Sequence, residues 1–267
     1  MTDRFLGMIL IAFCAFVPVA IEAANLHSII VADTSDEGIG SSTAIDYERM
    51  HREVQKIAHY TGLKLKEVTL KGNEARPKKL LERIRKLKVH SDDVVIFYFS
   101  GHGFRTPGKE GSPWPNLYFS REQNAVDFDL IREKLEEHNP RFILLIADAC
   151  NSLIPDEWAP VIVQKWFFKA IDDEILKENY RHLFLYETGV VMVTSSEAGE
   201  PSWATMSGGL YTMAFIQSLN QCVKSSETPS WQNILDKSVL IVGDNQHPDY
   251  HIYRGIDNNL RFATMSP

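Results

Sequence analysis

Residues 94–99 read VVIFYF and residues 142–147 read FILLIA, two continuous apolar runs of strand length. Strands buried on both faces of a parallel sheet have this composition, whereas strands with one wet face alternate polar and apolar residues. The runs LHSIIVA at 26–32 and VVMV at 190–193 have the same character. Together they predict the buried centre of a parallel sheet.

Amphipathic helical patterns separate these runs. Apolar residues recur at helical spacing over 50–58, 80–87, 128–135 and 210–219. This alternation predicts an α/β fold with a doubly wound, mostly parallel sheet and helices on both faces. The pattern breaks down over 151–188, where we expect a helix-bearing excursion from one domain that spans 24–267.

Composition narrows the class of protein. The chain has 267 residues with 44% hydrophobic and 24% charged side chains, enough apolar material for a large core. Its formal net charge of −7 has the wrong sign for a broad nucleic-acid interface. Three cysteines are too few for a disulfide scaffold. A globular enzyme or binding domain remains.

The N-terminus indicates export. Residues 5–21 carry no charged side chain. Arg4 stands before this run, and Glu22 and the small pair Ala23-Ala24 follow it. This layout is typical of a secretory signal peptide, here residues 1–23, with cleavage after Ala23. An uncleaved membrane anchor is the alternative, and it would be the protein's sole membrane contact. We therefore expect a secreted or periplasmic (extracytoplasmic) protein.

Two of the buried runs end in reactive chemistry. The first leads into Gly101-His102-Gly103 and the second into Asp148-Ala149-Cys150. Ligands of open parallel sheets bind beyond the carboxyl ends of the strands, so neighbouring strands would bring His102 and Cys150 together. An imidazole can take the thiol proton and later protonate a leaving amine. The N–H groups of Gly103 and Cys150 can face a developing oxyanion.

Either motif alone is weak evidence, because a glycine-flanked histidine or a buried cysteine is common. The pair, however, resembles the caspase-like cysteine peptidases, in particular the metacaspase and bacterial caspase-homologue branch. The spacing of the motifs is close to the roughly 50 residues of caspases. The resemblance covers roughly 26–255 and rests on these blocks: Phe99-Ser100-Gly101-His102-Gly103, Asp148-Ala149-Cys150-Asn151-Ser152, Val193-Thr194-Ser195-Ser196 and 208–215.

The sequence also departs from the family. Many metacaspases have His-Ser-Gly after the cysteine, whereas this chain has Asn151-Ser152-Leu153. The glutamine that precedes the cysteine in true caspases is absent, because Asp148-Ala149 stand there. This second difference bears on specificity.

The resemblance to metacaspases implies an acidic pocket for Arg or Lys at P1, the residue before the cleaved bond. Asp148 and Ser100 match the pocket residues, and Asp33, at the end of the first strand, is a candidate second carboxylate. A carboxylate binds a guanidinium through paired, charge-assisted hydrogen bonds. Ser195 and Trp203 are candidates for the lining of the peptide cleft.

We therefore expect a cysteine endopeptidase that acts on peptide or protein substrates, with no metal site and no cofactor. Calcium activation is a minor alternative, for which the acidic run Asp172-Asp173-Glu174 is the candidate site. Two other functions stay open: a silent caspase-like scaffold that binds peptides or partners, and a legumain-like peptidase or transamidase. The sequence indicates neither the oligomeric state nor the group that orients His102.

Overall fold

The computed structural model describes residues 24–106, 109, 111–149, 151–153 and 172–253. Its centre is a six-stranded sheet with the strand order β12-β9-β7-β3-β1-β2. Adjacent strands run parallel, except that β12 is antiparallel to β9. The predicted mostly parallel α/β sheet is confirmed. The strands are β1 (Asn25–Ala32), β2 (Lys64–Lys71), β3 (Val94–Ser100), β7 (Phe142–Asp148), β9 (Gly189–Thr194) and β12 (Asp249–Tyr253).

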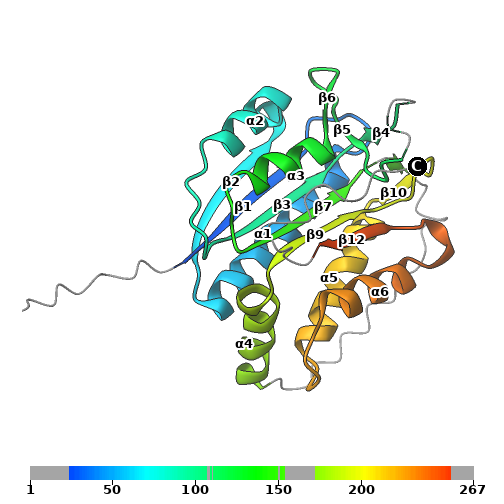
Figure 1. Ribbon diagram of the computed structural model, residues 1–267. Helices are drawn as coiled ribbons and strands as arrows, with labels where there is room; N and C mark the ends of the chain where they lie inside the picture. Colours follow the sequence, from blue (N-terminus) through cyan, green and yellow to red (C-terminus); the bar gives the residue numbers. More distant parts are fainter. Residues whose placement is uncertain (1–23, 107–108, 110, 150, 154–171, 254–267) are drawn as a thin grey trace, which may run out of the picture.

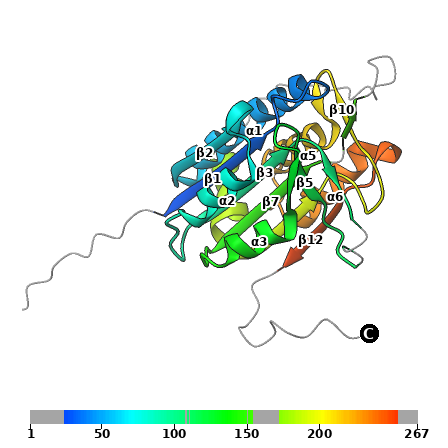
Figure 2. The same ribbon diagram turned by 90° about the horizontal axis from the view of Figure 1, so that it is seen from above.

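Helices cover both faces of this sheet (Figures 1 and 2). One face packs against α1 (Gly40–Thr61), α4 (Asp173–Arg181), α5 (Leu210–Val223) and α6 (Trp231–Val242), and the other against α2 (Pro77–Arg85) and α3 (Phe128–Glu136). Because successive strand residues point to opposite faces, each strand serves both cores. Ile96 and Leu144 belong to the α1 side, and Phe97 and Leu145 to the α3 side.

The predicted helices are all present, and local chemistry explains their ends. Pro77 occupies the first turn of α2, and the Asp127 side chain caps α3 by accepting the N–H of Asp129. α1 ends at Gly62, whose φ of 75° is the left-handed conformation that glycine adopts without strain. α1 also begins well before the apolar pattern at 50–58. Its first turns bury small and polar side chains, so the apolar pattern does not reveal them.

Two small sheets extend the carboxyl ends of the central strands and were not predicted. One contains β4 (Gly103–Phe104), β5 (Asn116–Phe119) and β6 (Asn124–Asp127), and the other β8 (Asn151–Leu153), β10 (Ser202–Thr205) and β11 (Gly208–Gly209). β4 follows β3, β8 follows β7 and β10 follows β9. Both therefore surround the sheet edge at which the reactive motifs were expected.

Some predictions fall on residues outside the described ranges. These are the export signal at 1–23, Cys150, and 154–171 within the excursion. The described end of this segment contains α4 and a π-helical turn at His182–Tyr186. Within the described residues, no helix has both the length and the apolar character needed to cross a membrane.

One buried acidic residue, through its carboxylate and its backbone carbonyl, ties together the amino ends of three central strands. Asp93, just before β3, accepts the N–H of Asn25 at 2.7 Å and that of His90 at 2.9 Å. Its Oδ2 lies 2.9 Å from Nε2 of His27 on β1. Its carbonyl accepts the N–H of Arg141, which precedes β7, at 3.0 Å. Burial alone would raise the pKa of Asp93, but these hydrogen bonds outweigh burial and lower it.

We predict that Asp93→Ala lowers the free energy of unfolding by about 2 to 3 kcal/mol at pH 7, because it leaves buried N–H groups unsatisfied. The lowered pKa means that the ionised carboxylate stabilises the fold above pH 3.8 and stops doing so as the pH falls through its folded value. The difference between wild type and variant should therefore shrink at pH 3. Urea unfolding at both pH values measures it, with exposed Asp92→Ala as the control; equal stability at pH 7 would contradict it.

Candidate active site

The carboxyl ends of β1, β3 and β7 lie at one level of the sheet. Ala32 pairs with Ser100, and Ser100 pairs with Asp148. Backbone hydrogen bonds continue past the strand ends, from Asp33 N–H to the Ser100 carbonyl at 3.0 Å and from Gly101 N–H to the Asp148 carbonyl at 3.1 Å. The two reactive motifs therefore leave neighbouring strands in register.

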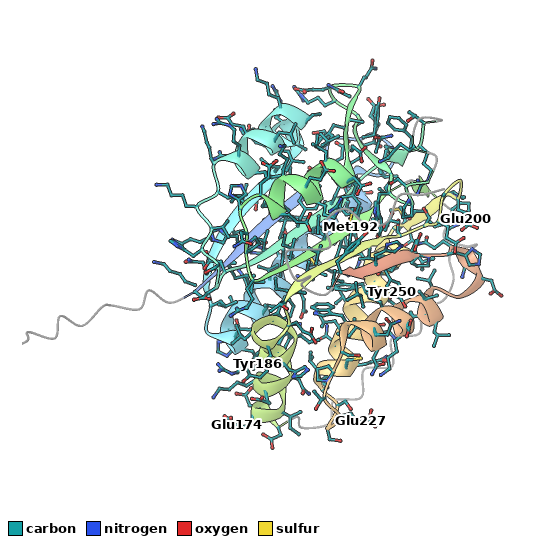
Figure 3. The ribbon with its side chains drawn as sticks, in the orientation of Figure 1. Glu174, Tyr186, Met192, Glu200, Glu227 and Tyr250 are labelled. Atoms are coloured by element: carbon teal, nitrogen blue, oxygen red, sulfur yellow. The ribbon has the colours of Figure 1, made fainter. Side chains whose placement is uncertain are left out.

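In Figure 3 this edge of the sheet can be located from two labelled residues, Tyr186 and Glu200. Tyr186 precedes β9 and Glu200 follows it, so their labels mark the amino and carboxyl ends of that strand. The strand ends described above lie toward the Glu200 side, because β1, β3 and β7 run in the same direction as β9.

His102 follows β3 and is held through its backbone. Its carbonyl accepts the Tyr118 N–H from β5 at 2.9 Å, and the next residue, Gly103, begins β4. The imidazole is about one-third exposed, and its Nε2 lies 3.3 Å from Oδ2 of Asp36. Cys150, two residues beyond Asp148, lies outside the described residues. The roles predicted for His102, Cys150 and Gly103 stay predictions.

Asp148 is fully buried and is held by the amino end of α5. Its Oδ2 accepts the Thr212 N–H at 2.9 Å and the Thr212 hydroxyl at 2.7 Å. Its Oδ1 accepts the Ser202 hydroxyl at 3.1 Å. Thr212 lies in the first turn of α5, where N–H groups have no partner within the helix and the helix dipole favours a negative charge.

Asp46, on α1, is a second buried carboxylate in the same place. It accepts the Gly209 N–H at 2.9 Å and the Ser100 hydroxyl at 3.0 Å. The guanidinium of Arg49, one turn further along α1, lies 3.6 Å from its Oδ1. Ser100, predicted as a pocket residue, thus contacts Asp46, while its strand partner is Asp148.

Gly209 separates the two carboxylates at short range. A Cβ atom at this position would collide with the Asp148 carboxylate and crowd that of Asp46. Glycine is therefore required here for contact, since its backbone φ of −64° is ordinary. The backbone between β11 and α5 lies directly against both acidic groups.

The pKa values of both carboxyl groups, Asp46 and Asp148, are raised. Burial first, and next the negative charge of Asp148, raises the pKa of Asp46 to about 7, although hydrogen bonds and Arg49 oppose the shift. Burial also raises the pKa of Asp148. Two adjacent carboxylates in a dry site hold a proton more tightly than one in water. A cation placed beside them would counter the charge repulsion that adds to the effect of burial on the pKa of Asp46.

Asp33, the predicted second carboxylate, is placed differently. Its Oδ2 accepts both the N–H of Ser120 at 2.9 Å and the Ser120 hydroxyl at 2.7 Å. Strand alternation explains the placement, because Ala32 faces the α1 side and the next residue faces the opposite side. The structure thus brings Asp46, rather than Asp33, to Asp148.

Ser195 and Trp203 lie beside the same strand ends. The buried Ser195 hydroxyl accepts the Ala149 N–H at 3.1 Å and donates to the Ala149 carbonyl at 2.9 Å. The half-buried Trp203 donates its Nε1–H to the Asn245 carbonyl at 2.8 Å, and its backbone N–H to Oε1 of Gln246 at 2.9 Å. Ser195 therefore braces the backbone just before position 150. Lining of a peptide cleft by these two residues stays a prediction.

Sequence reasoning missed Asp36, Asp46 and Gly209. The signal for Asp46 was present, because it lies four residues before Met50 on the buried stripe of α1, where a carboxylate is unexpected. Asp36 lies in a polar loop and gave no such signal.

Among the described residues no group of three or more histidine, cysteine or acidic side chains could hold a metal ion. In the acidic run, Asp172 caps α4, and Asp173 accepts the Tyr60 hydroxyl.

Comparisons with known proteins identify the family of the chain and a solved structure of similar fold. The family model for the caspase domain (peptidase C14) matches residues 41–254, well over half of the chain. No curated protein matches the sequence. The crystal structure of protein GSU0716 from Geobacter sulfurreducens is similar, with a TM-score of 0.55 and 15% identity, over 88% of this chain and 95% of that one. At this identity the likeness concerns the fold alone.

We predict that Asp46→Asn changes how stability depends on pH. Because folding raises the pKa of Asp46 from 3.8 to about 7, its contribution to stability is fully present below pH 3.8 and is lost as the pH rises to about 7. Relative to wild type, the variant should therefore gain about 2 kcal/mol between pH 5 and pH 8. Urea unfolding at both values measures this, with Glu48→Gln, an exposed acid on the same helix, as control. A variant that keeps the wild-type pH dependence would contradict it.

Proposed function

Since the chain belongs to the caspase family, we propose that it is a cysteine endopeptidase that uses His102 and Cys150 as a catalytic dyad. The observation that carries the proposal is the register of β3 and β7. Ser100 pairs with Asp148, so the segments that lead to His102 and Cys150 leave the sheet side by side and at the same level.

The chemistry of the pair is acyl transfer. His102 takes the proton of the Cys150 thiol, and the thiolate attacks the carbonyl carbon of the cleaved bond. The N–H groups of Gly103 and Cys150 stabilise the oxyanion of the tetrahedral intermediate. His102 then protonates the departing amine, and water releases the acyl group from sulfur by the same route.

We predict that Cys150→Ala and His102→Ala each lower kcat/KM by about a thousandfold or more, because neither residue of the dyad can act alone. The assay uses purified protein and fluorogenic peptides, and circular dichroism checks that each variant is folded. Cys222→Ala is the matched control, because that thiol is buried in α5 away from the strand ends and its loss should spare activity. Retained activity in either dyad variant would contradict the dyad, and the silent scaffold would follow if wild type were inactive as well.

For the substrate, we propose arginine or lysine at P1. Two carboxylates, Asp148 and Asp46, lie together beside the strand ends, and hydrogen bonds from Thr212, Ser202 and Ser100 orient them. A guanidinium or ammonium group between them would pair with both carboxylates and favour their ionised forms, against the burial and the mutual repulsion that raise the pKa of Asp46. An acidic P1 side chain would add a third negative charge.

The pair is covered in the structure. Asp148 has no exposed surface and Asp46 has 1%, so a P1 side chain reaches them only after side chains at the surface move aside. The guanidinium of Arg49 already lies beside one carboxylate of the pair and shows the kind of cation that we propose binds there. This guanidinium is 22% exposed, faces Asp46 and donates to the Ser207 carbonyl. In this proposal a P1 cation takes the inner position, beside Asp148, and Arg49 stays at the rim.

We predict cleavage of matched peptides with Arg or Lys at P1, and none with Asp or Asn. Asp148→Asn and Asp46→Asn should each lower kcat/KM for the arginine peptide by about a hundredfold, because each removes one charge from a buried pair. Asp33→Asn is the matched control, because Asp33 faces the other side of the sheet. Cleavage after Asp or Asn would keep the dyad and overturn the pocket, and an equal loss in Asp33→Asn would contradict the assignment of Asp46.

A further inference from the structure

His102 has a carboxylate partner in the loop between β1 and α1. Oδ2 of Asp36 lies 3.3 Å from the ring Nε2, and both side chains are partly buried, at 13% and 32% exposure. The backbone of His102 is fixed from the other side, through the hydrogen bond from Tyr118. The structure therefore fixes the His102 backbone through Tyr118 and places a carboxylate against the ring.

Asp36 is itself fixed through its other oxygen. Oδ1 accepts the N–H of Gly38 at 2.8 Å and that of Ile39 at 2.9 Å. The Asp36 carbonyl accepts the N–H of Gly40, the first residue of α1, at 3.1 Å. The carboxylate thus divides its oxygens: one orders the loop at the start of α1, and one faces the imidazole. A group held in this way has little freedom to turn away from the ring.

The charge of Asp36 suits this contact. Burial alone would raise its pKa, but the two N–H donors and His102 outweigh burial and lower it, so the group is an anion at neutral pH. Its acidic neighbours in the loop are placed otherwise. Asp33 binds Ser120, and Glu37 is exposed.

We propose that Asp36 is a positioning residue for His102: it accepts a hydrogen bond from Nε2–H and so keeps Nδ1 unprotonated for proton transfer with Cys150. This inference rests on the proposed peptidase function. The thiol proton moves to Nδ1, the resulting imidazolium keeps Nε2–H toward Asp36, and Nδ1 later gives the proton to the leaving amine. A carboxylate behind the ring stabilises that imidazolium and selects the productive tautomer.

Asp36→Asn keeps the contact of the side chain with the loop N–H groups and changes its contact with the imidazole. The amide oxygen still accepts from Gly38 and Ile39, while the amide NH₂ faces Nε2 and donates to it. The neutral ring must then carry its proton on Nδ1, the wrong tautomer for taking a proton from sulfur. We expect kcat to fall about 10- to 100-fold with KM nearly unchanged, because the substrate pocket is untouched.

The tautomer itself provides a readout that does not need activity. In the Cys150→Ala background, ¹⁵N NMR of the imidazoles above pH 8 distinguishes Nε2–H from Nδ1–H, and the His102 signals are assigned by their loss in His102→Gln. We expect Nε2–H with Asp36 and a shift to Nδ1–H in Asp36→Asn. Asp36→Ser is the second variant: its hydroxyl can accept the loop N–H groups without reaching the ring, and kcat should fall while the loop stays ordered. Glu37→Gln is the matched control and should change nothing.

The outcomes separate this inference from the function on which it rests. The expected tautomer change in a protein without peptidase activity would support Asp36 and refute the function. An unchanged tautomer in Asp36→Asn, in an active enzyme with an undiminished kcat, would overturn the role of Asp36 and leave the dyad in place. An unchanged tautomer with reduced kcat would equally overturn it, because the loss would then be structural.

Discussion

The parallel register of β1, β3 and β7 is the constraint on which the site depends. It brings Ala32, Ser100 and Asp148 to one level, and backbone hydrogen bonds from Asp33 and Gly101 extend that level beyond the strands. A parallel sheet cannot slip by one residue without turning each buried side chain to the other face. The apolar runs of these strands thus specify the core, and the pairing of Ser100 with Asp148 sets the level at which the two reactive segments leave the sheet.

The acidic pair illustrates how the fold supports charges that are costly to bury. Hydroxyl and N–H groups surround the oxygens, and Thr212 supplies an N–H from the first turn of α5. That N–H has no partner inside the helix, so the carboxylate satisfies a donor that would otherwise need water. The arrangement also explains Gly209, since any side chain there would occupy the space of the carboxylates.

The sequence was sufficient for the central sheet and for the neighbouring strand ends from which the two predicted reactive segments leave, but not for the side chains that contact them. Continuous apolar runs identify doubly buried strands, and parallel strands have functional carboxyl ends, so His102 could be located from local pattern alone. Asp46 and Asp36 come from α1 and the loop before it, and their contacts depend on how that helix packs. The place of Asp33 at a strand end makes it a candidate from the sequence, but strand alternation turns it to the opposite face of the sheet. The short strands of the two small sheets carry too few residues to show a period.

One helix serves both halves of the site. The loop at the start of α1 contains Asp36, whose Oδ1 is tied to the first N–H groups near the helix, and Asp46 follows on the same rigid rod. In our proposals Asp36 positions His102 for proton transfer, and Asp46 helps to bind the P1 side chain of the substrate. A displacement of α1 along its axis would then alter reactivity and selectivity together. On these proposals, a shift of this one helix would change substrate preference and turnover together, and could not change either property alone.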